Sequence, residues 1–423
     1  MKSSRFIMML LFANIITLNA QHKQPNILFI SIDDLRSELH AYGVADMITP
    51  NLDAIAAQGR LFKRHYAQVP TCGPSRMVML TGKNLTSSDE ISHPLLGNRL
   101  AGKPETDNPE TFIHHLKRNG YYTVGMGKIS HSISGRRGKE LELPHSWNDF
   151  VTNPDAFQMY AGGEHRDAKK TPPFEMLDVA DEVYPDGRVA QFAVKELEKR
   201  ANAKQPFFMA VGFLRPHLPF SAPKKYWDLY DRSKMNLSPN PDAPKNVADE
   251  FLHNSEEFFG QYYSPEKGGA RKRISDAYAK QIIHANHAAV SFVDAQVGKV
   301  MDKLKELGLD KNTIVVVWGD HGWHLGDQTI WGKHSAFENA LNSAMIVKTP
   351  QMKKAGIPSN SLIASVDIYP TLCELTGIQK PKGLDGTSFA PILDNPKNET
   401  RTEVLSYWKD VVSMRTDRYR LAI

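Results

Sequence analysis

The stretch PNILFISIDDL, residues 25–35, decides the fold class of this chain. A strand-like run that is apolar except for Ser31, Ile27–Ile32, ends abruptly in Asp33 and Asp34. Continuous runs of this length that are rich in branched apolar residues are typical of strands buried on both faces, as in a parallel sheet. The stretch therefore predicts a central strand with two carboxylates just beyond its end.

A second stretch repeats this arrangement near the other end of the chain. In NTIVVVWGDHGWHLGD, residues 312–327, the apolar run Ile314–Trp318 is followed by Asp320 and His321. Because chemistry in open α/β sheets gathers beyond the carboxyl ends of the strands, both polar pairs are expected on one rim of a shared sheet.

Helical periodicity occupies segments between and around these strands, at 51–62, 110–122, 188–200 and 286–308. Alternation of strands with helices favours a layered α/β fold. Two segments rich in Pro, Gly and charge, 132–175 and 221–270, are expected to be long loops within the domain rather than linkers.

Composition limits the class of protein. The 423 residues are 41% hydrophobic and 23% charged, which is ordinary for a globular protein and excludes a disordered chain. The formal charge of +5 falls to +3 when Lys2 and Arg5 are removed with a leader (5 − 2). No dense basic run is present, so we expect no nucleic-acid partner, and the mild excess suits an anionic substrate.

Residues 1–20 are predicted to be a cleaved signal peptide. Lys2 and Arg5 precede the apolar run Phe6–Ile16, and the small residue Ala20 offers a cleavage site. The alternative is an N-terminal membrane anchor, but the run is shorter than the roughly 20 apolar residues that a span needs. No later segment is long and apolar enough to span, so we expect an exported protein that is periplasmic or secreted, or lysosomal if the host is a eukaryote.

The remainder divides into a catalytic domain at 21–394 and a change of character at 395–423. The last segment resembles two strands, and two strands alone are marginally stable. They are expected either to join an existing sheet or to begin a smaller C-terminal subdomain that is incomplete at Ile423.

The polar pairs at the strand ends predict a metal site. Three carboxylates and one imidazole placed close together need a cation, and oxygen-rich ligation favours Ca²⁺, with Mg²⁺ as the alternative, over zinc. Taken singly, an Asp pair after a strand is equally well explained as a helix cap or a turn.

Only two cysteines occur, Cys72 and Cys373. An exported chain could pair them, but Cys373 lies in VDIYPTLCELTG, which has the pattern of a buried helix face. Cys72 lies in a Gly-Pro turn that gives a structural thiol no evident purpose. We therefore expect both cysteines to be unpaired, and burial accounts for Cys373 alone.

The residues from Cys72 to Lys83, CGPSRMVMLTGK, resemble the sulfatase signature, C-x-P-S-R followed by an L-T-G-R/K ending, with mild departures at Met79 and Lys83. The Asp-Asp and Asp-His pairs fall in the family's order. The chain is thus identified as similar to the formylglycine sulfatases of the alkaline phosphatase superfamily from about residue 25 to the end. The resemblance implies a large mixed, mostly parallel sheet flanked by helices and the start of a small C-terminal α+β subdomain.

Details of spacing resemble the iduronate-2-sulfatase branch of that family. GMGKISH gives Lys128 and His131 in the order G-K-x-x-H, and similar agreement occurs at His217 in AVGFLRPHLPF and at Lys333 in WGKHS. Each histidine considered singly is more often structural than catalytic.

The resemblance implies the chemistry of the site. A formylglycine-generating enzyme, or an anaerobic sulfatase-maturating enzyme, would oxidise Cys72 to an aldehyde whose hydrate attacks sulfur, through a sulfated intermediate that a simple serine could not release. The implied metal ligands are Asp33, Asp34, formylglycine at 72, Asp320 and His321. The implied sulfate-binding and proton-transfer residues are Arg76, Lys128, His131, His217 and Lys333. Five other histidines are expected to be structural or at the rim, namely His114, His115, His284, His287 and His334.

These features together predict a Ca²⁺-dependent hydrolase that removes sulfate from a sulfated oligo- or polysaccharide, with a 2-O-sulfated uronic acid as the preferred residue. The cations available for a uronate carboxylate are Arg166, Lys169, Lys170 and Arg215, and each is explained at least as well as a solvated surface charge. The alternatives are a phosphonate or phosphate ester hydrolase of the same superfamily and a non-catalytic protein that binds sulfated glycans.

Overall fold

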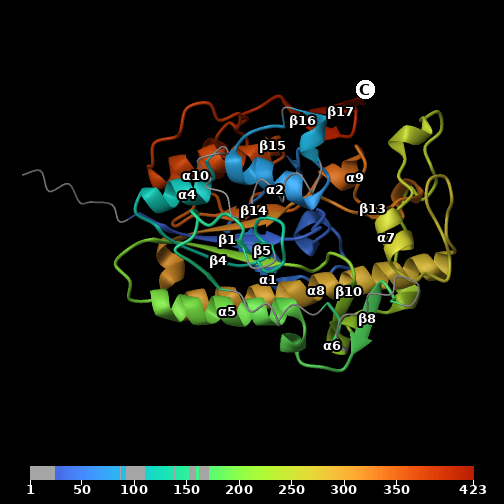
Figure 1. The fold of residues 1–423 in the computed structure, drawn as a ribbon, viewed down its shortest axis with the longest axis horizontal. Helices are drawn as coiled ribbons and strands as arrows, with labels where there is room; N and C mark the ends of the chain where they lie inside the picture. The colour runs from blue at the N-terminus through green and yellow to red at the C-terminus, as the bar shows by residue number, and fades with distance from the viewer. Residues whose placement is uncertain (1–23, 86, 92–109, 138–139, 152–158, 162–170) are drawn as a thin grey trace, which may run out of the picture.

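A seven-stranded sheet forms the centre of the protein in a computed structural model that describes residues 24–85, 87–91, 110–137, 140–151, 159–161 and 171–423 (Figure 1). Its strand order is β2-β14-β11-β1-β9-β4-β7. The strands span Asn26–Ile32 (β1), Arg60–Leu61 (β2), Tyr122–Gly127 (β4), Asp149–Val151 (β7), Phe207–Phe213 (β9), Thr313–Gly319 (β11) and Met345–Lys348 (β14).

The sheet is mixed and mostly parallel, as the sequence predicts. Five strands from β11 to β7 run parallel, whereas β14 pairs antiparallel with β11 and with β2 at one edge. In the central register, Ile30 lies opposite Val317 on one side and Val211 on the other. The ends of β1 and β11 are therefore neighbours, which brings the two predicted polar pairs to one rim.

Helices cover both faces of the sheet, which is why apolar side chains from β1 point to both of its faces and every residue of the strand is buried. Ile27 and Phe29 pack into one apolar cluster, and Leu28, Ile30 and Ile32 pack into the other. In Figure 1 the lower face carries the long helices α5 and α8, and α2, α4 and α10 lie above the sheet. The helices span Pro50–Gln58 (α1), Cys72–Thr81 (α2), Phe112–Arg118 (α4), Pro185–Arg200 (α5), Asp276–Glu306 (α8), Ile368–Thr376 (α10) and Ala390–Asp394 (α11).

All four predicted helical segments contain a helix, with shifted bounds. The last of them, α8, begins ten residues before the predicted start, where the Ser275 hydroxyl accepts a hydrogen bond from Tyr278 N at 3.2 Å and caps the helix. The first, α1, ends earlier than expected because Gly59 passes close to β14. A Cβ at Gly59 would lie 2.7 Å from Val347 O, so glycine permits the chain to leave the helix and enter β2.

The two segments predicted to be long loops, 132–175 and 221–270, contain short ordered elements among irregular chain, so this prediction holds only in part. In and beside them, β5 (Arg136–Arg137) pairs with β6 (Glu140–Leu141), and β8 (Phe174–Leu177) pairs with β10 (Phe220–Pro223). The second segment also contains α6 (Lys224–Trp227) and α7 (Glu256–Gln261). Elsewhere in the chain, β3 (His65–Tyr66) pairs with β15 (Ile363–Ala364), β12 (His324–Leu325) pairs with β13 (Trp331–Gly332), and α9 spans Glu338–Leu341. These segments lack strong periodicity because tertiary packing, rather than local pattern, orders them.

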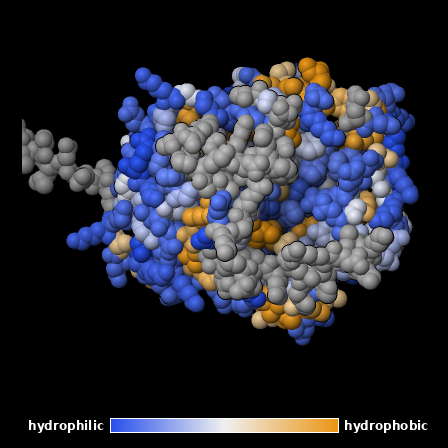
Figure 2. Space-filling view, in the orientation of Figure 1, coloured by the Kyte–Doolittle hydropathy of each residue, from blue (hydrophilic) through white to orange (hydrophobic). Residues whose placement is uncertain are grey.

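The C-terminal segment forms three antiparallel strands rather than the two expected, namely β16 (Glu403–Trp408), β17 (Val411–Thr416) and β18 (Arg420–Ala422). Ser406 Oγ donates to Ala67 O at 2.7 Å and Tyr407 N donates to Gln68 O at 2.7 Å, so β16 is fastened just upstream of Cys72. The outer face of this sheet is partly apolar, and Figure 2 shows apolar surface at the upper end where Figure 1 places β16 and β17.

Two further predictions concern the cysteines and the leader. Cys72 and Cys373 are both buried and unpaired, as expected. The predicted signal peptide at 1–20 lies outside the described residues. Among the helices that the structure describes, none combines the length and the apolar character that crossing a membrane requires.

Candidate active site

Side chains that follow two neighbouring parallel strands meet at one rim of the sheet. Asp33 and Asp34 follow β1, and Asp320 and His321 follow β11. All four are almost completely buried. Asp34 adopts a left-handed backbone with φ of 60°, and its N–H donates to Asp320 Oδ1 at 2.9 Å. This bond joins the two strand ends and fixes the direction of the carboxylates.

Cys72 is the first residue of α2 and points into the same cluster. Its Sγ lies 3.8 Å from Asp34 Oδ1, 3.4 Å from His321 Nε2 and 3.4 Å from Lys333 Nζ. Ligand atoms of Cys72, Asp320 and His321 all lie within 4.8 Å of one another, and those of Asp33, Asp34, Cys72 and His217 form a second such group. The structure thus brings all five predicted metal ligands together.

Arg76 lies one helical turn after Cys72 and ties the cluster to the helix. Its guanidinium donates from Nη2 to Asp33 Oδ1 at 3.0 Å and from Nε to Asp320 Oδ2 at 3.0 Å. Nη1 donates to Ser31 Oγ at 2.9 Å and to Lys128 O at 2.7 Å. A planar, permanently charged fork suits this place, because it satisfies two carboxylates and the backbone together.

Lys128 enters the cluster directly after β4. Its ammonium donates to Asp33 Oδ2, and its backbone N–H donates to Gly212 O at 3.0 Å. Gly127 has a φ of +72°, and a Cβ there would lie 2.0 Å from Gly212 O. The glycine before Lys128 therefore lets β4 approach β9 closely while turning the lysine toward the carboxylates.

Lys333 and His217 complete the site, together with a residue that sequence reasoning missed. Lys333 follows β13, and its Nζ lies 3.0 and 3.2 Å from the two carboxylate oxygens of Asp34. Glu257 on α7 lies 3.4 Å from Lys333 Nζ and 3.3 Å from His217 Nε2. Nothing in the sequence marks Glu257, because it stands beside Glu256 in a segment without periodicity.

Two more of the histidines considered from the sequence, His131 and His334, lie in different parts of the structure. His131 is half-buried three residues beyond Lys128, and its backbone N–H donates to Glu142 Oε2 at 3.2 Å. His334 ring nitrogen Nε2 lies 3.3 Å from Thr71 Oγ1, and the ring stacks on Trp408 with centroids 4.7 Å apart. His334 is therefore a rim residue, to which the C-terminal sheet contributes an aromatic neighbour.

Arg215 does not serve as a free cation for a substrate carboxylate, contrary to one sequence-based expectation. It is completely buried and donates to the backbone carbonyls of Ser221, His217 and Met159. Its role is to hold the turn that carries His217. Arg166, Lys169 and Lys170 lie outside the described residues.

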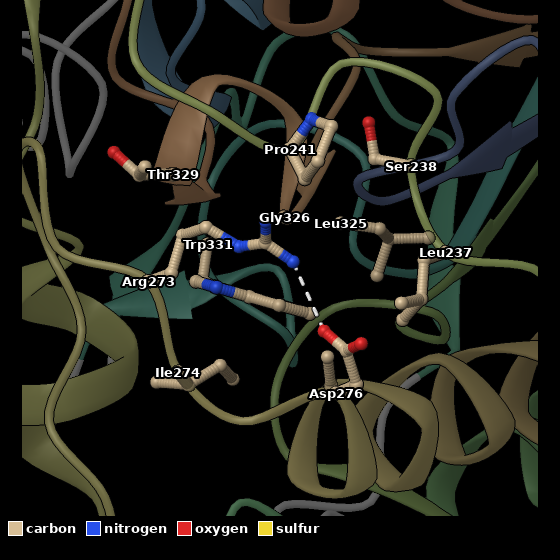
Figure 3. Close-up of a pocket in the computed structure, with 11 residues that line it drawn as sticks. Leu237, Ser238, Pro241, Arg273, Ile274, Asp276, Leu325, Gly326, Thr329 and Trp331 are labelled. Carbon is tan, nitrogen blue, oxygen red and sulfur yellow. Dashed lines mark hydrogen bonds and ion pairs between the residues drawn. The ribbon is translucent and has the colours of Figure 1, made fainter.

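A separate pocket beside the β12–β13 hairpin contains none of the predicted site residues (Figure 3). Arg273 Nη2 donates to Asp276 Oδ1 at 3.0 Å across it, and Trp331 and Leu325 supply apolar walls. The pocket is therefore distinct from the buried charge cluster, although Trp331 stands only two residues before Lys333.

The surroundings shift the pKa values of Asp33 and Asp34 in opposite directions. Although burial would raise the pKa of the Asp33 carboxyl, Lys128, His217 and Arg76 outweigh burial and hold that pKa well below its usual range. Burial raises the pKa of Asp34 to about 7, with Asp33 and Glu257 adding to the rise and Lys333 and His321 opposing it. Burial and Asp33 also raise the pKa of the Cys72 thiol well above its usual value, so this sulfur is not held as a thiolate.

The donor set fits a hard divalent cation. Asp33, Asp34, Asp320 and Glu257 face the cations Arg76, Lys128 and Lys333, so four carboxylates against three cations leave one net negative charge. Carboxylate oxygens with one imidazole are ligands that Ca²⁺ or Mg²⁺ accepts, and a dication would reverse the sign of the cluster.

Comparison with known proteins is consistent with this architecture. A solved phosphonate monoester hydrolase of Agrobacterium radiobacter aligns with a TM-score of 0.73 at 23% identity, covering 95% of this chain and 87% of that one. A structure solved in complex with its substrate D-glucosamine-2-N,6-O-disulfate aligns with a TM-score of 0.72 at 20% identity, covering 95% and 88%. The class is thus the alkaline-phosphatase-like α/β fold, as expected from the sequence.

Sequence comparison names the family. The family model described as sulfatase matches residues 25–378. A sulfatase from Formosa agariphila is 30% identical over 417 residues, which cover 94% of this chain and 78% of the relative. The iduronate 2-sulfatase of Homo sapiens is 30% identical over 403 residues, covering 86% and 71%. The chain belongs to the sulfatase family.

Proposed function

We propose that this protein hydrolyses a sulfate ester of a saccharide, using a formylglycine formed from Cys72 as nucleophile and Ca²⁺ as cofactor. The observation that carries the proposal is the position of Cys72 Sγ at 3.4 Å from both His321 and Lys333 and 3.8 Å from Asp34, inside a buried ring of charge. A thiol with a raised pKa is a poor nucleophile, which favours its conversion into another group.

Conversion of Cys72 requires a partner enzyme. The change from –CH2–SH to an aldehyde removes two electrons from carbon and releases the sulfur as sulfide, so an external oxidant is needed. Cys72 is only 3% exposed, which favours modification before the chain folds. The partner would be a formylglycine-generating enzyme or an anaerobic sulfatase-maturating enzyme acting on residues 72–76. The leader-like residues 1–20 support export as the setting of this activity.

The ligands proposed for the cation are Asp33, Asp34, residue 72, Asp320 and His321. When bound, the cation would make the hydrated nucleophile more acidic and would take up charge from the sulfate group. Mg²⁺ is the alternative ion, because both accept oxygen ligands and differ mainly in coordination number.

The protein's own side chains would bind and orient the sulfate. Arg76 holds Asp33 and Asp320 in place, and Lys128 and Lys333 offer ammonium groups at the edge of the cluster, where an anionic ester needs them. His217 or Lys333 would place a proton on the leaving saccharide oxygen, and His131 would accept a proton from the hydrated nucleophile.

The relatives support a saccharide substrate and, within that class, a 2-O-sulfated uronic acid. The 30% identity to an iduronate 2-sulfatase extends over 86% of this chain. Segment 132–175 begins directly after His131, and segment 221–270 begins four residues after His217. These two segments are the parts expected to contact the sugar.

The proposal is tested by comparing turnover of an aryl sulfate and the matched aryl phosphate by protein produced in a host that matures sulfatases. Faster release of sulfate than of phosphate is expected. Predominant phosphate turnover would instead favour a phosphonate or phosphate ester hydrolase, and binding of sulfated saccharides without any sulfate release would favour the non-catalytic glycan-binding alternative. A panel of 2-O- and 6-O-sulfated disaccharides then tests the uronic acid.

Calcium is expected to raise the melting temperature of the wild-type protein, because a ligand that binds only the folded state stabilises it by about 2.7 kcal/mol at a hundred times its Kd. Asp34→Asn removes a proposed ligand carboxylate and should abolish the shift. The exposed Asp417→Asn variant serves as control and should keep it. An equal calcium-induced shift in Asp34→Asn and wild type, measured by scanning fluorimetry against EDTA, would contradict this ligand assignment.

A further inference from the structure

Glu257 bridges Lys333 and His217, two side chains that border the aspartate cluster. Its Oε1 lies 3.3 Å from His217 Nε2 and its Oε2 lies 3.4 Å from Lys333 Nζ. The side chain of Glu257 is 14% exposed, whereas that of Lys333 is 3% exposed. Although burial opposes ionisation, Lys333 and His217 lower the pKa of Glu257 to about 2, so the bridge is a carboxylate near neutral pH.

The fold fixes this carboxylate in place. Glu257 lies in the first turn of α7, and Ser255 precedes that helix with a left-handed φ of 56°. Trp331 N donates to Ser255 Oγ at 2.8 Å, which fastens α7 to β13, the strand that leads directly into Lys333. The neighbouring Phe258 is completely buried and packs against Trp331 with ring centroids 6.4 Å apart. The contacts between α7 and β13 therefore hold the side chains of Glu257 and Lys333 next to each other.

The geometry around His217 gives this carboxylate a chemical consequence. The Nδ1 of His217 lies 2.6 Å from Leu218 O, and a carbonyl oxygen can only accept a hydrogen bond. The Nε2 faces Glu257, which also accepts. Both ring nitrogens of His217 therefore face acceptors: Nδ1 can donate to the Leu218 carbonyl, and a second proton on Nε2, as in the protonated ring, would be held by the Glu257 carboxylate.

We propose that Glu257 is a positioning residue for leaving-group protonation: it aligns His217 and Lys333 so that one of them delivers a proton to the saccharide oxygen as the S–O bond breaks. In this step the sulfur–oxygen bond cleaves, the sulfuryl group passes to the nucleophile at position 72, and the oxygen leaves with the proton as an alcohol. The inference rests on the proposed function and adds to it the residue that organises the donor side of the site.

The test uses Glu257→Gln, because glutamine keeps the shape but not the charge. Two sulfate esters are compared in wild type and variant: a saccharide sulfate, whose alcohol leaves only with a proton, and 4-nitrophenyl sulfate, whose phenolate leaves without one. The kcat for the saccharide sulfate is expected to fall by about 10²-fold, in the range of general-acid effects, while turnover of the aryl sulfate changes by less than about 3-fold. Glu257→Asp should recover part of the loss.

Glu256→Gln is the matched control, because Glu256 stands in the same turn of α7 but is exposed, and it should leave both activities unchanged. Equal losses on the two esters, or no loss on either, would overturn the proposal, since a merely structural role slows both reactions alike. Failure of the proposed function is distinguishable, because wild-type protein would then release no sulfate from either ester. Should Glu257→Gln fold poorly, as judged by its melting temperature, the same comparison of esters is made with Glu257→Ala, which also removes the carboxylate.

Discussion

Cys72→Ser is expected to reduce multiple-turnover sulfate release by at least about 10³-fold, the range of losses seen when a nucleophile is removed. Serine fills nearly the same buried space, so the fold and the surrounding charge cluster should persist. A serine hydroxyl could accept the sulfuryl group, but it has no second hydroxyl on the same carbon with which to expel sulfate. The defect should therefore lie in turnover rather than in binding, and a single equivalent of product at most is expected.

Two measurements decide this prediction. Steady-state turnover of 4-nitrophenyl sulfate is compared with Cys373→Ser, a control that alters the other buried cysteine, on α10, and should retain full activity per folded molecule. Mass spectrometry of the tryptic peptide 65–76 from active wild-type protein should show the aldehyde in place of the thiol, trapped by hydrazide reagents. Undiminished turnover by Cys72→Ser, or an unmodified thiol in an active wild-type sample, would contradict the assignment.

Much of the site was accessible from sequence because its residues are attached to local patterns. Asp33 and Asp320 follow long apolar runs, and a parallel sheet necessarily brings such strand ends to one rim. Cys72 and Arg76 share one helical turn, so their relation is fixed by four residues of chain. For these side chains, secondary structure and topology alone determine the neighbours.

Other parts depended on packing that no local pattern records. Glu257 acquires its place because Ser255 bonds to Trp331, a contact across 76 residues of sequence. Arg215 is a cation of the kind usually found at the surface, yet each of its three guanidinium nitrogens donates to a backbone carbonyl around the turn that carries His217. The third C-terminal strand, β18, is only three residues long and is defined by its register against β17 rather than by periodicity.

Fold and site also depend on each other at the rim. The same bonds that orient Asp33 and Asp320 also hold α2 against the sheet, because Arg76 extends from that helix to both strand ends. Ser75 Oγ adds a bond from α2 to the backbone carbonyl of Asp320. Removing the buried charge of Arg76 should therefore lower the free energy of unfolding.

Arg76→Gln is accordingly expected to lower the free energy of unfolding by about 3–5 kcal/mol, the cost of leaving buried carboxylates without their partner. Arg76 is completely buried, so solvent cannot replace its bonds to Asp33 and Asp320. Arg76→Lys restores the charge but not the planar fork, and it should recover only part of the loss. The exposed Arg418→Gln variant is the control and should unfold like wild type.

Urea unfolding in the presence of EDTA measures these values without a cation that could neutralise the carboxylates. If Arg76→Gln unfolded within about 1 kcal/mol of wild type, below the usual cost of breaking a buried ion pair, the aspartates would have to be protonated in the folded state. Recovery of stability by Arg76→Lys to the wild-type value would show that charge alone, rather than bidentate geometry, holds the rim. We expect the free energy of unfolding to decrease from wild type to Arg76→Lys to Arg76→Gln. This order requires that both the charge and the bidentate geometry of Arg76 contribute.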